Sequence, residues 1–130
     1  MEIQHKNIAI IGVLMALIGI LLGAFGAHGL EAVLSPEKLA SFEVGVRYQL
    51  YHGLALLVLS LLIFKGSAVI KQVASLIVIG TLLFSGSIYI LSFATAWNFS
   101  PGFLVFITPL GGVLLIIGWL RLLVALLKKH

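Results

Sequence analysis

Apolar residues in this chain form long runs that charged residues do not interrupt. Three stretches contain no Asp, Glu, Lys or Arg: residues 7–30, 48–64 and 72–120. About 20 residues of helix cross the hydrocarbon core of a bilayer, so the first two stretches fit one crossing each and the third fits two. Turn-forming residues and a tryptophan at 94–102 divide the third stretch. The pattern predicts four transmembrane helices over about 8–27, 48–64, 72–93 and 103–120.

Composition supports a membrane protein and excludes a soluble enzyme or an unstructured chain. Of the 130 residues 62% are hydrophobic and 9% are charged, whereas soluble domains are about half apolar and a quarter charged. The fold class predicted is therefore all-α, an integral membrane bundle of four helices in a single domain over residues 1–130. The basic residues lie singly or in pairs at the ends of apolar runs, which is typical of membrane anchoring and not of nucleic-acid binding.

The distribution of basic residues also predicts an orientation. One side of the membrane would carry Lys6, Lys65, Lys71, Arg121, Lys128 and Lys129, and the other side Lys38 and Arg47. Because basic residues favour the cytoplasmic side, both termini are expected in the cytoplasm, with the protein in the bacterial cytoplasmic membrane.

The first outward loop contains a helix start of its own. Ser35, Pro36 and Glu37 combine a hydroxyl cap, a proline that tolerates the first helical position and an acid near the positive end of the helix dipole. Two interpretations follow. Either this helix continues into the second span, or it is a short amphipathic helix on the outer membrane surface.

Small residues on the first span predict how the helices pack. They recur at spacings of three and four: Gly12, Ala16, Gly19, Gly23 and Ala27. Within lipid such a stripe lets another helix backbone approach closely. The stripe is therefore expected to hold the bundle together or to join copies of the chain in a homo-oligomer.

Polar residues of the predicted spans would gather in the outer half of the bilayer. The candidate ligand-binding set is His28, Tyr48, Gln49, His52, Ser85, Tyr89 and Thr108. Three explanations remain open: these groups bond to one another and lock the helices, they line a pocket open to the outer face, or the two histidines hold a metal. Two histidines with no cysteine form an incomplete zinc ligand set, so no metal or cofactor is expected.

Sequence motifs offer no support for enzyme catalysis. The chain has no G-x-S-x-G, H-E-x-x-H or phosphate-binding loop. Small multidrug transporters have a similar span count, but they depend on a carboxylate in mid-membrane, and no predicted span of this chain contains one.

Four motifs in order resemble those of a known family. GAFGAHG at 23–29, YQLYH at 48–52, LFSGSIY at 83–89 and TPLGG at 108–112 are similar to signatures of the domain of unknown function 423, also called uncharacterised protein family 0382. The resemblance implies a small multipass protein of the bacterial cytoplasmic membrane. It implies no activity and no catalytic residue.

The sequence therefore favours a non-enzymatic binding or assembly protein with a polar pocket on its outer face. The alternative is a small transporter or channel subunit in which the same polar groups line part of a path. The expected partners are the lipid bilayer, a second copy of the chain and a small molecule of unknown identity.

Overall fold

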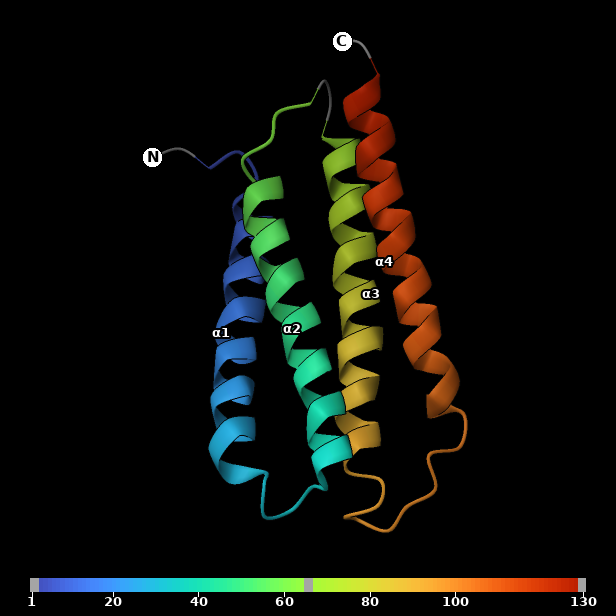
Figure 1. Ribbon diagram of the computed structural model, residues 1–130. Helices are drawn as coiled ribbons and strands as arrows, with labels where there is room; N and C mark the ends of the chain where they lie inside the picture. Colours follow the sequence, from blue (N-terminus) through green and yellow to red (C-terminus); the bar gives the residue numbers. More distant parts are fainter. Residues whose placement is uncertain (1–2, 65–66, 129–130) are drawn as a thin grey trace.

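The computed structural model describes residues 3–64 and 67–128 and is helical throughout its long elements (Figure 1). The four helices are α1 (Lys6–Gly29), α2 (Pro36–Leu59), α3 (Ala68–Ser92) and α4 (Leu104–Leu127). The start of α1, the α2–α3 connection and the end of α4 lie at one end of the bundle, which we call the terminal end. The α1–α2 and α3–α4 connections lie at the other end, which we call the loop end.

Three of these helices are long and apolar enough to cross a membrane: α1, α3 and α4. The all-helical class and the membrane character predicted from the sequence are therefore confirmed. Helix α2 does not belong to this group by composition, since its first twelve residues include Glu37, Lys38, Glu43 and Arg47.

The largest difference between the predicted and observed helices is in α2, predicted at 48–64 and observed at Pro36–Leu59. It begins at Pro36 because the Ser35 hydroxyl accepts a hydrogen bond from the Lys38 backbone N–H at 3.3 Å. The helix continues through Gly45 without interruption, so a separate amphipathic helix in the first loop is wrong. The first of the two interpretations, one helix running on from Pro36, is confirmed.

Helix α4 also continues beyond its predicted end at residue 120. A charged residue marks the edge of an apolar run but does not stop a helix, and Arg121 remains helical. Its guanidinium donates to Gln72 Oε1 of α3 at 3.2 Å. Two of the basic residues used to predict orientation, Lys65 and Lys129, lie outside the described residues.

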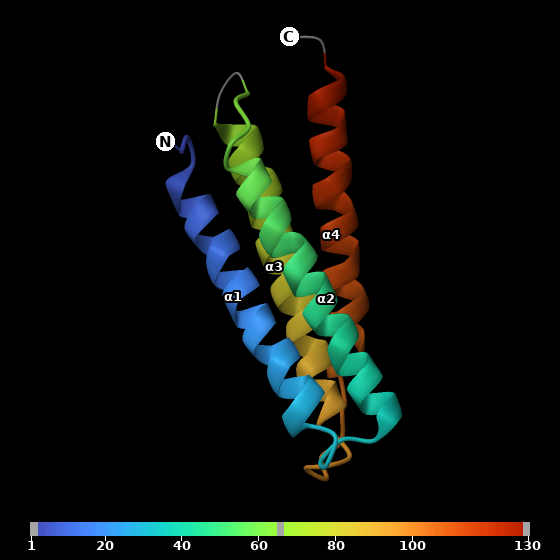
Figure 2. The same ribbon diagram turned by 60° about the vertical axis from the view of Figure 1, so that its left-hand side comes forward.

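Helices adjacent in the chain are also adjacent in space (Figures 1 and 2). Thus α2 and α3 lie in the middle, α1 packs mainly on α2, and α4 packs mainly on α3. Two apolar clusters fill the interior. The one toward the terminal end joins α1, α2 and α3 through Met15, Leu56, Leu59, Ile70, Val73, Ala74 and Ile77. The one toward the loop end contains Leu30, Leu34, Phe42 and Val46.

The glycines of α1 face α2 at very short range. A Cβ added to Gly12 would lie 2.7 Å from the carbonyl oxygen of Gly53, a backbone atom that cannot move aside. A Cβ on Gly19 would meet Leu50 at 2.9 Å, and one on Gly23 would meet Val46 at 3.2 Å. The stripe of α1 therefore holds α2 within the same chain.

The last predicted member of this stripe, Ala27, is exposed, and Gly26 packs against Phe42 in its place. Two helices that wind around each other repeat about every 3.5 residues, so alternating steps of four and three keep a stripe on the contact side. The half-buried Ala16 fits this alternation. A second step of four after Gly23 turns Ala27 outward.

Candidate functional site

Gln49 connects three of the four helices through its side-chain amide. The Tyr89 hydroxyl of α3 donates to Gln49 Oε1 at 2.7 Å, and Gln49 Nε2 donates to the Met15 carbonyl of α1 at 2.9 Å. The Gln49 side chain is buried. An unpaired amide is costly in hydrocarbon, so these partners satisfy Gln49 and also fix the register of α1, α2 and α3.

A second bond joins α2 and α3 one turn earlier along each helix. The Ser85 hydroxyl donates to the Gly45 carbonyl at 2.7 Å. The absence of a side chain at Gly45 permits this approach, because a Cβ there would lie 2.7 Å from the ring of Tyr89. Gln49, Ser85 and Tyr89 thus form one group around α2, which we call the glutamine cluster.

His52 links α2 to α4. The Trp119 indole N–H donates to His52 Nε2 at 3.0 Å, and His52 Nδ1 lies 2.7 Å from the Tyr48 carbonyl oxygen. A carbonyl only accepts, so the hydrogen bonds assign the proton of the neutral imidazole to Nδ1 and leave Nε2 as the acceptor. Both ring nitrogens of this buried histidine therefore have partners.

Helices α3 and α4 are joined by two hydroxyl groups nearer the loop end. Ser87 Oγ and Thr108 Oγ1 lie 2.6 Å apart, and Ser87 Oγ also donates to the Phe84 carbonyl at 3.0 Å. Thr108 therefore acts as a helix contact at the start of α4.

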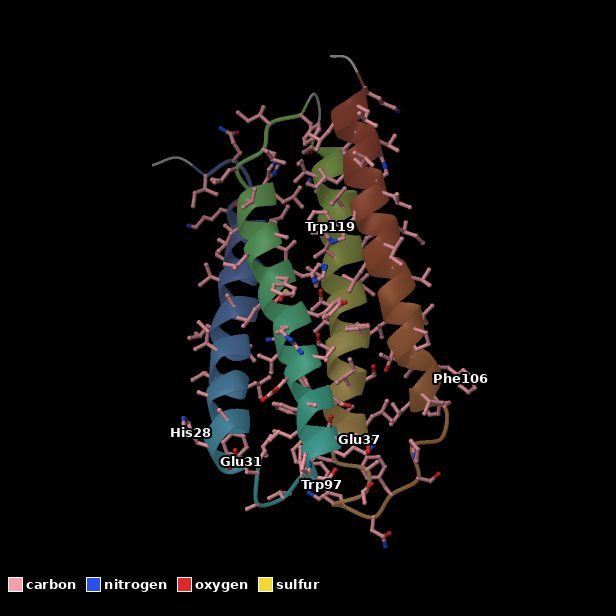
Figure 3. All side chains as sticks on the ribbon, in the orientation of Figure 1. His28, Glu31, Glu37, Trp97, Phe106 and Trp119 are labelled. Carbon is pink, nitrogen blue, oxygen red and sulfur yellow. The ribbon has the colours of Figure 1, made fainter. Side chains whose placement is uncertain are left out.

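The structure does not bring the two predicted histidines together. His28 is exposed at the loop end of α1 and points away from the bundle (Figure 3). His52 follows Pro36, the first residue of α2, by 16 positions, which is about 24 Å along the helix axis. It therefore lies in the half of α2 nearer the terminal end.

The position of the polar residues along α2 also differs from the prediction. Tyr48, Gln49 and His52 were expected to open a span on the outer side, but they lie at and beyond the middle of a helix that begins at Pro36. Tyr48 is 40% exposed, and its ring packs on Phe84 with centroids 4.6 Å apart. Ligand binding by the predicted set stays a prediction, without the His28–His52 pair at its centre.

Trp119 is the partner of His52 that the sequence analysis missed, and its side chain is 46% exposed. Figure 3 shows it within the half of α4 near the terminal end. The available signal was an indole N–H in the middle of an apolar run, since a hydrogen-bond donor among apolar residues needs an acceptor. The close approach of Gly53 to Gly12 of α1, and that of Gly45 to Tyr89 of α3, were also not recognised.

The interior polar groups satisfy one another across the described part of the bundle. Each buried side-chain nitrogen or oxygen in residues 3–64 and 67–128 has a hydrogen-bond partner. Within the same residues no group of three or more His, Asp or Glu is arranged to hold a metal ion. Chemically, this arrangement fixes four helices relative to one another.

Comparisons with known proteins agree with the membrane character of this fold. A family model described as "Protein of unknown function (DUF423)" matches residues 22–112. The UPF0382 membrane protein SERP0230 of Staphylococcus epidermidis is 43% identical over 123 residues, which cover 95% of this chain and 97% of the relative. The UPF0382 membrane protein YwdK of Bacillus subtilis is 42% identical over 125 residues, which cover 95% of this chain and 98% of the relative.

A third relative shows a similar identity over a shorter region. The UPF0382 membrane protein of Haemophilus influenzae is 40% identical over 101 residues, which cover 78% of this chain and 77% of the relative. No solved structure was found to match the fold. On the family match and on these long alignments, the chain belongs to the DUF423 family, whose relatives here carry the name UPF0382 membrane protein.

Proposed function

We propose that the chain crosses the bacterial cytoplasmic membrane four times, with α2 as the second crossing. The supporting observation is that α1 and α3 run in the same direction while α2 runs back beside them (Figures 1 and 2). Two spans with the same direction need a connection that returns across the bilayer. Helix α2 has 24 residues, about 36 Å at 1.5 Å per residue, which is long enough for that return.

The charges of α2 are compatible with this crossing. Glu37 and Lys38 lie in its first turn, at the loop end. Glu43 and Arg47 lie further along on the exposed side of the helix. Helical side chains lean toward the N-terminus of their own helix, so both of these long side chains extend back toward the interface at the loop end.

We further propose a non-enzymatic binding or assembly role within the membrane in preference to transport. The argument rests on the pairing of the interior polar side chains. A transport path needs polar groups that face water or solute, whereas Gln49, His52 and Tyr89 are each bonded to another helix. Self-association would use the outer faces of α1 and α4, because α2 already covers the glycine stripe of α1.

Single cysteines test the four crossings directly, because the chain contains no cysteine of its own. Ser35→Cys and Ser100→Cys mark the two loop-end connections, and Ser67→Cys marks the terminal end; all three serines are exposed. In intact cells a membrane-impermeant maleimide should label the first two and spare the third until the cells are lysed. The cysteine-free chain is the control. Labelling of Ser35→Cys and Ser67→Cys from the same side would show that α2 does not cross.

Proteoliposomes test the role. Liposomes that contain the purified protein should release small ions and solutes no faster than empty liposomes do. Chemical cross-linking in the same liposomes should capture a second copy of the chain. Solute flux that His52→Ala abolishes, while that variant remains folded, would replace the assembly role with transport.

A further inference from the structure

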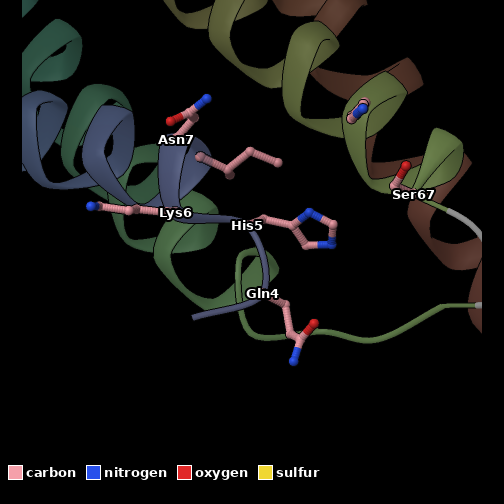
Figure 4. A pocket seen from close by; sticks show the side chains of 7 residues that line it. Gln4, His5, Lys6, Asn7 and Ser67 are labelled. Carbon is pink, nitrogen blue, oxygen red and sulfur yellow. The ribbon is translucent and has the colours of Figure 1, made fainter. Parts of the chain in front are cut away.

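A groove of about 530 Å³ opens at the terminal end, between the start of α1 and the start of α3 (Figure 4). It is lined by Gln4, His5, Lys6, Asn7, Ile8, Ser67 and Lys71. In Figure 4 the His5 ring points toward the Ser67 side, while the Lys6 amine points away from it. Nearly every lining residue offers a hydrogen-bond donor, and two of them are cationic.

An apolar groove of about 370 Å³ continues from this polar one along α1 and α3. Its lining residues are Ile8, Ile11, Lys71, Ala74, Ser75, Val78 and Ile79, so Ile8 and Lys71 belong to both grooves. Along α3 the distance from Lys71 to Ile79 is eight residues, about 12 Å. One leaflet of hydrocarbon is about 15 Å deep, so the apolar part matches most of a leaflet.

Charge at this end of the bundle is of one sign in the described residues. The described carboxylates, on Glu31, Glu37 and Glu43, belong to the α1–α2 connection and the first eight residues of α2, toward the loop end. The terminal end carries Lys6, Lys71, Arg121 and Lys128. Helices α1 and α3 both begin beside the groove with no acidic residue in their first turns, so their dipoles add to the positive potential.

We propose that these two grooves together bind one anionic phospholipid, with its phosphate against Lys71 and His5 and an acyl chain between α1 and α3. The polar part supplies the cations and donors that a phosphate requires, and the apolar part begins where the headgroup ends. The site rests on the four crossings proposed above and adds to the assembly role. The site uses the side of α1 that α2 leaves uncovered, because α2 packs against the side of α1 that carries the glycines.

Native mass spectrometry of the full chain, released from nanodiscs, tests the site with two probes. Phosphatidylglycerol should remain bound to the protein in preference to zwitterionic phosphatidylcholine of the same acyl composition. Lys71→Gln should weaken phosphatidylglycerol binding about fivefold, the effect of one lysine near a membrane surface. Lys71 is exposed, so the variant should fold. Lys128→Gln is the matched control, since it removes the same charge directly after α4, at the same end, without touching the groove.

A second variant separates a lipid from a free anion. Ser75 is exposed and lines the apolar groove, so Ser75→Phe should fill the acyl-chain site and abolish the preference for phosphatidylglycerol with no change of charge. Inorganic phosphate should not compete with the lipid at millimolar concentration.

Three results would overturn the proposal: equal retention of the two lipids, equal loss in Lys71→Gln and Lys128→Gln, or unchanged binding in Ser75→Phe. A dimer that dissociates in Ser75→Phe would assign the groove to a second copy of the chain. The cysteine-labelling experiment detects a failure of the four crossings independently. Loss of lipid selectivity with the labelling pattern intact would therefore refute this site alone.

Discussion

Replacing Gln49 by leucine tests whether the glutamine cluster holds the bundle together. The substitution keeps the side-chain volume roughly constant and removes both the acceptor of the Tyr89 hydroxyl and the donor to the Met15 carbonyl. If the cluster is structural, the variant loses stability because the Tyr89 hydroxyl is left without its partner. If the cluster exists to bind a ligand, stability without ligand should change little.

The expected magnitude follows from the two bonds that are lost. Hydrogen bonds between membrane helices contribute about 0.6 kcal/mol on average and up to about 1.7 kcal/mol, so Gln49→Leu should cost about 1–3 kcal/mol. Tyr89→Phe removes one of the two bonds and should cost less. In the double variant the shared bond is lost only once, which predicts a coupling energy of about 0.6–1.7 kcal/mol.

Reversible unfolding in mixed detergent and sodium dodecyl sulfate micelles, followed by circular dichroism, measures these differences. Tyr51→Phe is the matched control, because it removes one hydroxyl from α2, the helix that carries Gln49. The Tyr51 side chain is 59% exposed, so the variant should unfold like the wild type. Wild-type stability in Gln49→Leu, or strictly additive effects of the two substitutions, would refute the structural role of the cluster.

Two further substitutions test the helix contacts. Gly12→Leu places a side chain against the Gly53 backbone, so its free energy of unfolding should fall by at least the roughly 1–3 kcal/mol of an overpacked core. Ala27→Leu, at an exposed position, should change the free energy of unfolding in the same micelles by less than about 0.5 kcal/mol. Equal effects of the two substitutions would contradict the observed stripe. His52→Phe leaves the Trp119 N–H unpaired and should lower the free energy of unfolding by about 1–3 kcal/mol. The double variant His52→Phe with Trp119→Phe should regain most of that stability. Additive losses in the double variant would contradict the bond.

Long apolar runs were sufficient to predict the helices, because a helix satisfies its own backbone in lipid and few alternatives exist. The position of α2 was less predictable. Its first twelve residues carry four charges, and charge indicates where a segment meets water better than where a helix begins. The beginning of α2 depends on the Ser35 cap and Pro36, which the sequence analysis recognised while leaving the length of the helix open.

The candidate site was harder to predict, because polarity identifies a residue but not its partner. Thr108 belonged to the candidate set, and it bonds to Ser87 of α3, which did not. Gln49 and His52 lie further along their helix than predicted, because α2 begins at Pro36, twelve residues before its predicted start. The partner of His52 is an indole in an apolar run, and the partners of Gln49 and Ser85 include backbone carbonyls. No side-chain pattern identifies a carbonyl as an acceptor.

The arrangement of the helices separates the residues that hold this protein together from those available to bind. Helix α1 meets α2 through its glycines, and the interior hydrogen bonds extend outward from α2 to each of the other helices. This leaves the side of α1 toward α3 open near the terminal end, where the groove between Ile8 and Ile79 is found. Substitutions inside the bundle should therefore change stability and leave lipid selectivity intact. Substitutions at Lys71 or Ser75 should do the reverse, and a variant that changed both would show that the groove is coupled to the interior.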